Sequence, residues 1–116
     1  MHRYYVYIMS NFKRTVLYIG VSNNLIRRII EHKYGLGSVF TRKYKLKHLI
    51  YYEEYQYIKD AIQREKELKG WVREKKVNLI KSENPKVRDL SEKLLKEYSH
   101  REINEVVSEL RNIYKN

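Results

Sequence analysis

The segments RYYVYIM at residues 3–9 and TVLYIGV at residues 15–21 decide the fold of this chain. Both are rich in β-branched and aromatic residues, and SNFKR at residues 10–14 separates them with a turn-like composition. The two segments therefore predict an antiparallel hairpin. Apolar side chains occupy both faces of each segment, which is typical of a sheet that helices cover on both sides.

The next part of the chain predicts a helix and a third strand. Polar residues 22–24 offer N-cap oxygens before the helical pattern LIRRIIEHK of residues 25–33, and Gly35 is expected to end that helix. Residues 35–45 predict a basic loop, and HLIYYEEY at residues 48–55 predicts a strand. The order of elements to this point is β-β-α-β.

Helical patterns fill the remainder. A long helix is expected over residues 58–81, with a kink or break near Gly70, and the Asn-Pro pair at residues 84–85 predicts a further helix to about residue 98. The capping box SHRE at residues 99–102 opens a last amphipathic helix. The prediction is an α+β fold, with a three-stranded mixed sheet flanked by helices and extra C-terminal helices. Residues 1–98 are expected to form the main domain, and residues 99–116 are expected to form a helical extension packed on it.

The amino-acid composition limits the classes of partner that this chain is expected to bind. Lys and Arg number 25 against 14 Asp and Glu, which gives a formal charge of +11 and indicates a polyanionic partner. Nucleic acid is favoured over a membrane, because no basic amphipathic helix or lipidation motif lies near the N-terminus. The chain has no cysteine, which excludes disulfide-linked partners and cysteine zinc sites. No segment is apolar enough for a signal peptide or a membrane span, so a cytoplasmic location is expected.

One carboxylate lies where an apolar residue is expected. At about 100° per residue, Glu65 falls near the centre of a helical stripe, and Glu67 falls on the opposite side. The stripe consists of Ala61, Ile62, Leu68 and Val72. Burying a carboxylate costs several kcal/mol unless a cation or several donors meet it. Glu65 therefore predicts either a structural ion pair with an arginine or a metal ligand.

The first helix supplies positive charge. Arg28 and His32 are four residues apart and share one face, whereas Arg27 lies across the apolar stripe. Helical phase does not choose between the two arginines as functional residues, since both flank the stripe.

Tyrosine is unusually frequent, with 12 copies in 116 residues. Tyr5 and Tyr7 alternate on the first strand, and Tyr18 precedes Gly20, which permits a close approach of its backbone by another group. Each tyrosine taken alone indicates core packing or a base-stacking surface.

Taken together and in order, these residues resemble the GIY-YIG nuclease superfamily, and most of all its small stand-alone bacterial proteins. The resemblance rests on Tyr5-Val6-Tyr7, on Tyr18-Ile19-Gly20, on Arg28 and His32, and on Arg64-Glu65 of the next long helix, and it spans about residues 3–90. Tyr5 departs from the glycine of the family's first motif, which affects the expected geometry of the hairpin more than the chemistry.

The resemblance implies roles for the matching residues. Glu65 would bind a single Mg²⁺ or Mn²⁺ ion, and Arg28 would stabilise negative charge on the phosphoryl group. Either Tyr7 or Tyr18 would orient or deprotonate the attacking water, and His32 occupies a position where relatives carry His or Tyr. Asn84 matches a family asparagine that follows the second helix, although a helix cap explains it equally well.

The expected function is that of a divalent-metal-dependent endonuclease, with DNA favoured over RNA. The alternative is a basic nucleic-acid-binding module on the same fold that does not catalyse cleavage. The last helix is a candidate contact for a homodimer or a protein partner. Basic residues are expected to contact nucleic acid, namely Arg27, Lys33, Arg42, Lys43, Lys45 and Lys69.

Overall fold

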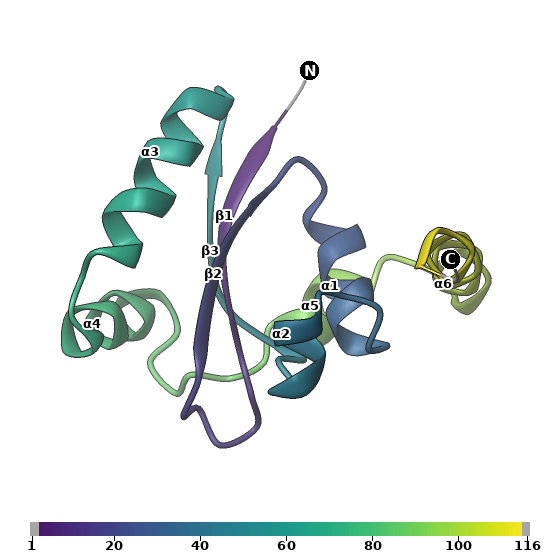
Figure 1. Ribbon diagram of the computed structural model, residues 1–116, viewed down its shortest axis with the longest axis horizontal. Coiled ribbons are helices and arrows are strands. Elements are labelled where there is room, and N and C mark those ends of the chain that lie inside the picture. The colour runs from purple at the N-terminus through teal and green to yellow at the C-terminus, as the bar shows by residue number, and fades with distance from the viewer. Residues whose placement is uncertain (1–2, 115–116) are drawn as a thin grey trace.

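A computed structural model describes residues 3–114 and shows a small sheet between two layers of helices (Figure 1). The strands are β1 (Tyr4–Ser10), β2 (Leu17–Ser22) and β3 (His48–Tyr55). The helices are α1 (Leu25–Lys33), α2 (Val39–Lys43), α3 (Ile58–Lys69), α4 (Arg73–Glu83), α5 (Ser91–Leu95) and α6 (His100–Tyr114). Within the described residues, no helix combines the length and apolarity that crossing a membrane requires.

The sheet has the strand order β2-β1-β3, and both pairings are antiparallel. The predicted α+β class is confirmed, but the expectation of a mixed sheet was wrong. Strand β3 does run in the same direction as β2, yet it pairs with β1 in the centre. A parallel pair would require β3 to lie beside β2, which is instead an outer strand of the sheet.

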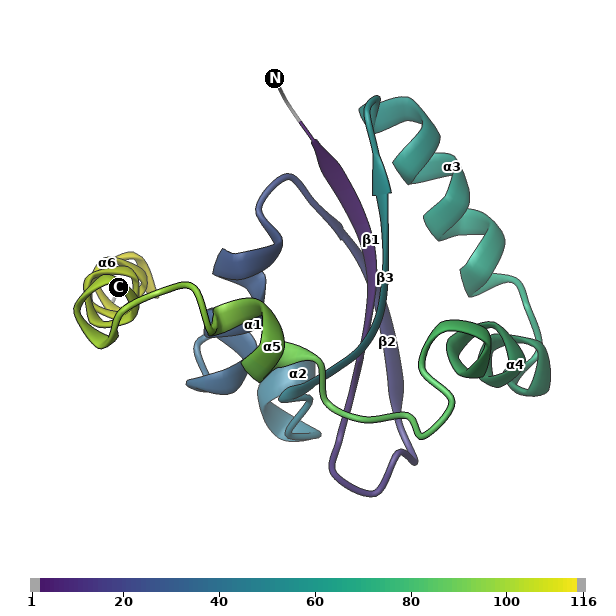
Figure 2. The same ribbon diagram turned by 180° about the vertical axis from the view of Figure 1, so that it is seen from behind.

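Alternate side chains of the central strand enter two separate cores. Val6 and Ile8 pack with residues of β2, β3, α3 and α4, whereas Tyr7 and Met9 pack on the opposite face with α1, α5 and α6. Seen from behind, residues 84–90 carry the chain from the α4 side of the sheet to the α5 side (Figure 2). Strand β1 is therefore buried on both faces, as its apolar composition predicts.

The N-terminal half of the chain follows the prediction closely, with one exception. Asn24 caps α1, with its side chain accepting a hydrogen bond from the Arg27 backbone at 3.0 Å, and Gly35 follows the helix with a φ of 69°. Residues 39–43 form the short helix α2, where a loop was expected. The Ser38 side chain starts that helix by accepting a hydrogen bond from the Thr41 backbone, and one helical turn is too short to produce a periodic pattern.

The C-terminal half departs more from expectation. The expected long helix is two helices, because the chain turns at Gly70 and is extended at Val72. The helix expected from Asn84 to about residue 98 is reduced to α5. Asn84 instead ends α4, and Val87 has a φ of 47°, which interrupts a helix. The capping box of α6 is confirmed, since Ser99 and Glu102 exchange hydrogen bonds at 2.7 and 3.1 Å.

Asn84 connects residues 84–90 to β3 by hydrogen bonds, and its replacement by alanine should destabilise the protein. The buried amide donates to the carbonyl groups of Ile50 and Arg88 at 2.9 and 2.8 Å and accepts from the Arg88 backbone at 3.1 Å. Asn84→Ala should lower the free energy of unfolding by about 2–4 kcal/mol, because buried backbone groups lose their partners. Urea denaturation would measure this. Ser82→Ala, at an exposed side chain, should have little effect and serves as the control.

Candidate active site

Three side chains from three elements meet on the α1 face of the sheet. Tyr7 of β1, Tyr18 of β2 and His32 of α1 form a triangle with ring centroids 5.9 to 6.3 Å apart. Tyr7 and His32 are buried, and Tyr18 is half-buried. Residues predicted to act together from separate parts of the sequence therefore do lie together.

Gly20 makes this arrangement possible. It is the cross-strand partner of Tyr7, and a Cβ atom placed on it would lie 2.5 Å from the Tyr7 hydroxyl oxygen. The missing side chain leaves room for the Tyr7 ring to lie across β2, toward the outer edge of the sheet. The close approach expected at this glycine is thus made by a side chain of the neighbouring strand.

Burial governs the protonation of the triangle. Desolvation raises the pKa of Tyr7 well above its ordinary value, and the nearby Tyr18 raises it further, while the charge of Arg28 lowers it. Burial also lowers the pKa of His32 to about 4, and the Arg28 charge acts in the same direction. At neutral pH, Tyr7 is therefore a phenol that can donate a hydrogen bond, and His32 is an uncharged imidazole.

The depressed pKa of His32 predicts acid sensitivity. As the pH falls from 6.5 to about 4, the unfolded chain takes up the proton before the folded protein does. The contribution of His32 is complete above pH 6.5, and about 3 kcal/mol of the unfolding free energy should be lost across this window. Urea denaturation between pH 7.5 and 4 should show a smaller loss for His32→Gln than for the unchanged protein. His100→Gln, at an exposed position, should leave the loss intact.

Arg28 is held by a carboxylate that the sequence did not single out. Its Nη1 donates to both oxygens of Glu31, at 3.0 and 2.9 Å, and Glu31 also accepts a hydrogen bond from the Tyr114 hydroxyl at 3.1 Å. Glu31 is buried, whereas the Arg28 side chain is 41% exposed. A guanidinium has five N–H donors, so Arg28 keeps donors for a further anion. Helical phase cannot reveal this group, because Tyr114 is 83 residues away from Glu31.

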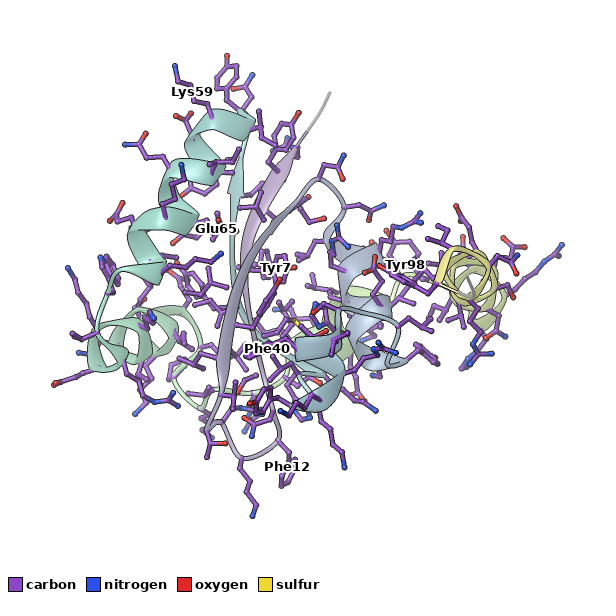
Figure 3. All side chains as sticks on the ribbon, viewed as in Figure 1. Tyr7, Phe12, Phe40, Lys59, Glu65 and Tyr98 are labelled. Atoms are coloured by element: carbon purple, nitrogen blue, oxygen red, sulfur yellow. The ribbon has the colours of Figure 1, made fainter. Side chains whose placement is uncertain are left out.

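Glu65 lies on α3, facing the sheet from the side opposite Tyr7 (Figure 3). Its side chain is 21% exposed, and its negative charge contributes to the raised pKa of Tyr7, one member of the triangle. The predicted arginine partner is absent among residues 3–114. The only ion pair of Glu65 in this part of the chain is with Lys69, one turn along α3, at 3.5 Å from Nζ to Oε1.

Two other glutamates of this fold have carboxylates that arginine and tyrosine side chains neutralise. Glu53 accepts from Arg64 Nε and Nη2 at 2.9 and 3.0 Å, and from the hydroxyl groups of Tyr51 and Tyr55. Glu31 is similarly bound by Arg28. Among residues 3–114, Glu65 is paired only with Lys69, and the carboxylate therefore retains the capacity to bind a further cation.

The donor set at this site is a single carboxylate. Among residues 3–114, no group of three or more His, Cys, Asp or Glu side chains could hold a metal ion. Zinc sites need three or four such ligands, whereas Mg²⁺ binds through one or two carboxylates and completes its shell with water and phosphate oxygens. Glu65 fits an ion of the second kind.

The basic residues expected to contact nucleic acid are distributed unevenly around this site. Arg42, Lys43 and Lys45 are exposed on and just after α2. Arg27 contacts Glu109 of α6 at 3.4 Å, and Lys69 pairs with Glu65, so both have partners within the protein. Lys33 is half-buried at the end of α1. Of these six side chains, four have no ion pair among the described residues, and three of the four, Arg42, Lys43 and Lys45, lie on or just after α2.

Comparison with known proteins shows the family to which the chain belongs. The model of the GIY-YIG catalytic domain matches residues 3–78. The chain belongs to the GIY-YIG family. A UPF0213 protein of Staphylococcus aureus is 35% identical over 81 residues, a match that covers 70% of this chain and 98% of that protein. A UPF0213 protein of Staphylococcus saprophyticus is 35% identical over 80 residues, covering 69% of this chain and 96% of that protein.

The fold of a GIY-YIG relative has also been observed directly. The solution NMR structure of a UPF0213 protein from Bacillus halodurans is similar, with a TM-score of 0.50 and 26% sequence identity, and it covers 78% of this chain and 95% of that one. The GIY-YIG catalytic domain indicates nuclease-type activity, and the family typically uses a divalent metal. The family match ends at residue 78, so Tyr114, which binds Glu31, lies outside it.

Proposed function

We propose that this protein is an endonuclease that hydrolyses phosphodiester bonds in DNA with the help of one Mg²⁺ or Mn²⁺ ion. The observation that carries the proposal is Glu65, a mostly buried carboxylate that has no arginine partner among residues 3–114 and whose charge acts on Tyr7 of the triangle. Burying a carboxylate is costly unless cations or donors compensate it, and the ion pair with the exposed Lys69 compensates Glu65 only in part, which favours an external cation as a further partner.

The chain's own residues suit the remaining steps of hydrolysis. A bound divalent ion would supply Lewis-acid activation of a phosphoryl oxygen. The free donors of Arg28 would stabilise the negative charge that grows on the phosphoryl group as water attacks phosphorus and the P–O bond breaks. Tyr7 stays protonated and would donate a hydrogen bond. Tyr18 is the less buried tyrosine and is suited to orient the attacking water.

Cleavage assays test this proposal directly. The protein should cut single-stranded, nicked or branched DNA when Mg²⁺ or Mn²⁺ is added, and EDTA should stop the reaction. Cleavage that continues in EDTA would contradict the role of the metal. An absence of cleavage on every substrate, with both metals, would contradict the proposal as a whole.

The second candidate is a nucleic-acid-binding module without catalysis, which the net charge of +11 and the single-carboxylate donor set favour. This candidate predicts binding with a steep salt dependence and no product with either metal. Binding without cleavage would select it over the nuclease.

A further inference from the structure

An exposed row of aromatic rings extends from the candidate site to the surface. The Tyr44 and Phe40 centroids are 4.7 Å apart, the Phe40 and Tyr18 centroids 6.2 Å, and the Tyr18 and Tyr7 centroids 6.3 Å. We call Tyr44, Phe40 and Tyr18 the aromatic row. It starts at the triangle and ends at Tyr44, just after α2, and Phe40 is labelled in Figure 3.

The fold does not explain the outer part of this row. Phe40 is 45% exposed and Tyr44 40% exposed, and neither belongs to the two cores of the described residues. Leu46 and Leu49, which follow in the chain, fill the core at this end of the sheet. A phenylalanine has no polar group that gains from contact with water, so its exposure beside a candidate active site indicates a ligand.

The charges around the row identify the chemistry of that ligand. No acidic residue occurs between Glu31 and Glu53, while Lys33, Arg42, Lys43, Lys45 and Lys47 lie in this interval. The Lys43 Nζ lies 5.4 Å from the centre of the Tyr44 ring. Aromatic faces beside unpaired cations form the arrangement by which proteins bind single-stranded nucleic acid, because the bases stack on the rings and the phosphates meet the cations.

We infer that the aromatic row binds an unpaired nucleobase next to the phosphodiester that is cut, so that the substrate is single-stranded DNA or a duplex with unpaired nucleotides at the cleavage point. Within a duplex, neighbouring base pairs cover both faces of each base, and Phe40 cannot stack on them. Phe40 also has no hydrogen-bonding group with which to read a base edge, so the contact selects unpaired structure and not sequence. The position of the cut rests on the proposed function, whereas base binding does not.

Binding measurements in EDTA separate the two proposals, because they need no catalysis. A fluorescently labelled single strand and a blunt duplex of equal length would be titrated with protein at several salt concentrations. Phe40→Ala should weaken binding of the single strand about 10-fold, equivalent to about 1.4 kcal/mol, and leave duplex binding and the salt slope unchanged. Lys43→Ala should weaken both complexes and reduce the salt slope by about one.

Matched variants exclude an effect on folding or on aromatic residues in general. Phe12→Ala removes an exposed ring at the tip of the β1–β2 hairpin and should change neither complex. Phe40→Leu keeps an apolar side chain without an aromatic face and should weaken single-strand binding as Phe40→Ala does, whereas Phe40→Trp should preserve it. Circular dichroism would establish that each variant is folded.

Single strands with an abasic site at successive positions complete the test. The effect of Phe40→Ala should disappear when the abasic site occupies the nucleotide that stacks on the ring. Equal losses on single strand and duplex, no loss on either, or no binding of any DNA would overturn the inference. A selective loss in a protein that cleaves nothing would uphold the inference and refute the nuclease.

Discussion

Replacing Glu65 by glutamine should reduce metal-dependent cleavage by about 100-fold or more, since the carboxylate proposed to bind the ion loses its charge. The stability of the protein should not fall, because the partner of Glu65 among residues 3–114 is the exposed Lys69, which water can solvate after the substitution. Single-turnover cleavage at saturating DNA and titration of Mn²⁺ by calorimetry would measure the two losses, in rate and in metal binding.

Glu53→Gln provides the opposite pattern as a control. Glu53 is bound by Arg64 and by two tyrosine hydroxyls, so this variant should lose about 1–3 kcal/mol of unfolding free energy and keep its cleavage rate. Glu65→Gln could instead behave like Glu53→Gln, with an unchanged cleavage rate and a lower free energy of unfolding. In that case Glu65 is a structural residue and the proposed metal site is wrong.

Replacing Arg28 by alanine should lower the cleavage rate by about 100- to 1000-fold, because the developing phosphoryl charge loses its positively charged donor. The variant should also be less stable, since the buried Glu31 loses the partner that binds both of its oxygens. A lower cleavage rate of Arg28→Ala could therefore come either from lost catalysis or from lost stability.

The double variant Arg28→Ala/Glu31→Gln separates them. It removes the buried charge together with its partner, and much of the lost stability should return, as measured by urea denaturation. Cleavage should remain as low as in Arg28→Ala. Recovery of cleavage along with stability would show that Arg28 acts only through the fold.

The sequence predicted the parts of this molecule in which local pattern and tertiary structure agree. The strand at residues 48–55 and the helix at residues 25–33 have the predicted bounds, because a composition rich in aromatic and aliphatic residues marks the first and a helical apolar stripe marks the second. Glu65 was placed on the inner face of its helix by phase alone, and its side chain is indeed mostly buried. The triangle could be assembled only from the family resemblance.

Contacts between distant segments account for what the sequence did not predict. The strand order depends on whether β3 pairs with β1 or with β2, and no local sequence pattern determines this pairing. Residues 84–90 were expected to be helical because Asn-Pro often starts a helix, yet the Asn84 amide binds the carbonyl group of Ile50 in β3 instead. The sequence did not single out Glu31, because its hydrogen bond with Tyr114 depends on how α6 packs against α1.

The fit of the Tyr7 ring over Gly20 also constrains how such sequences can diverge. A methyl group at position 20 would occupy the space of the Tyr7 hydroxyl, so a larger residue there requires a smaller one at position 7. The two positions belong to different strands and are 13 residues apart, but they should change as a pair. Gly20→Ala alone should displace the phenol from the triangle, whereas homologues that have shortened the side chain at position 7 are free to lose the glycine.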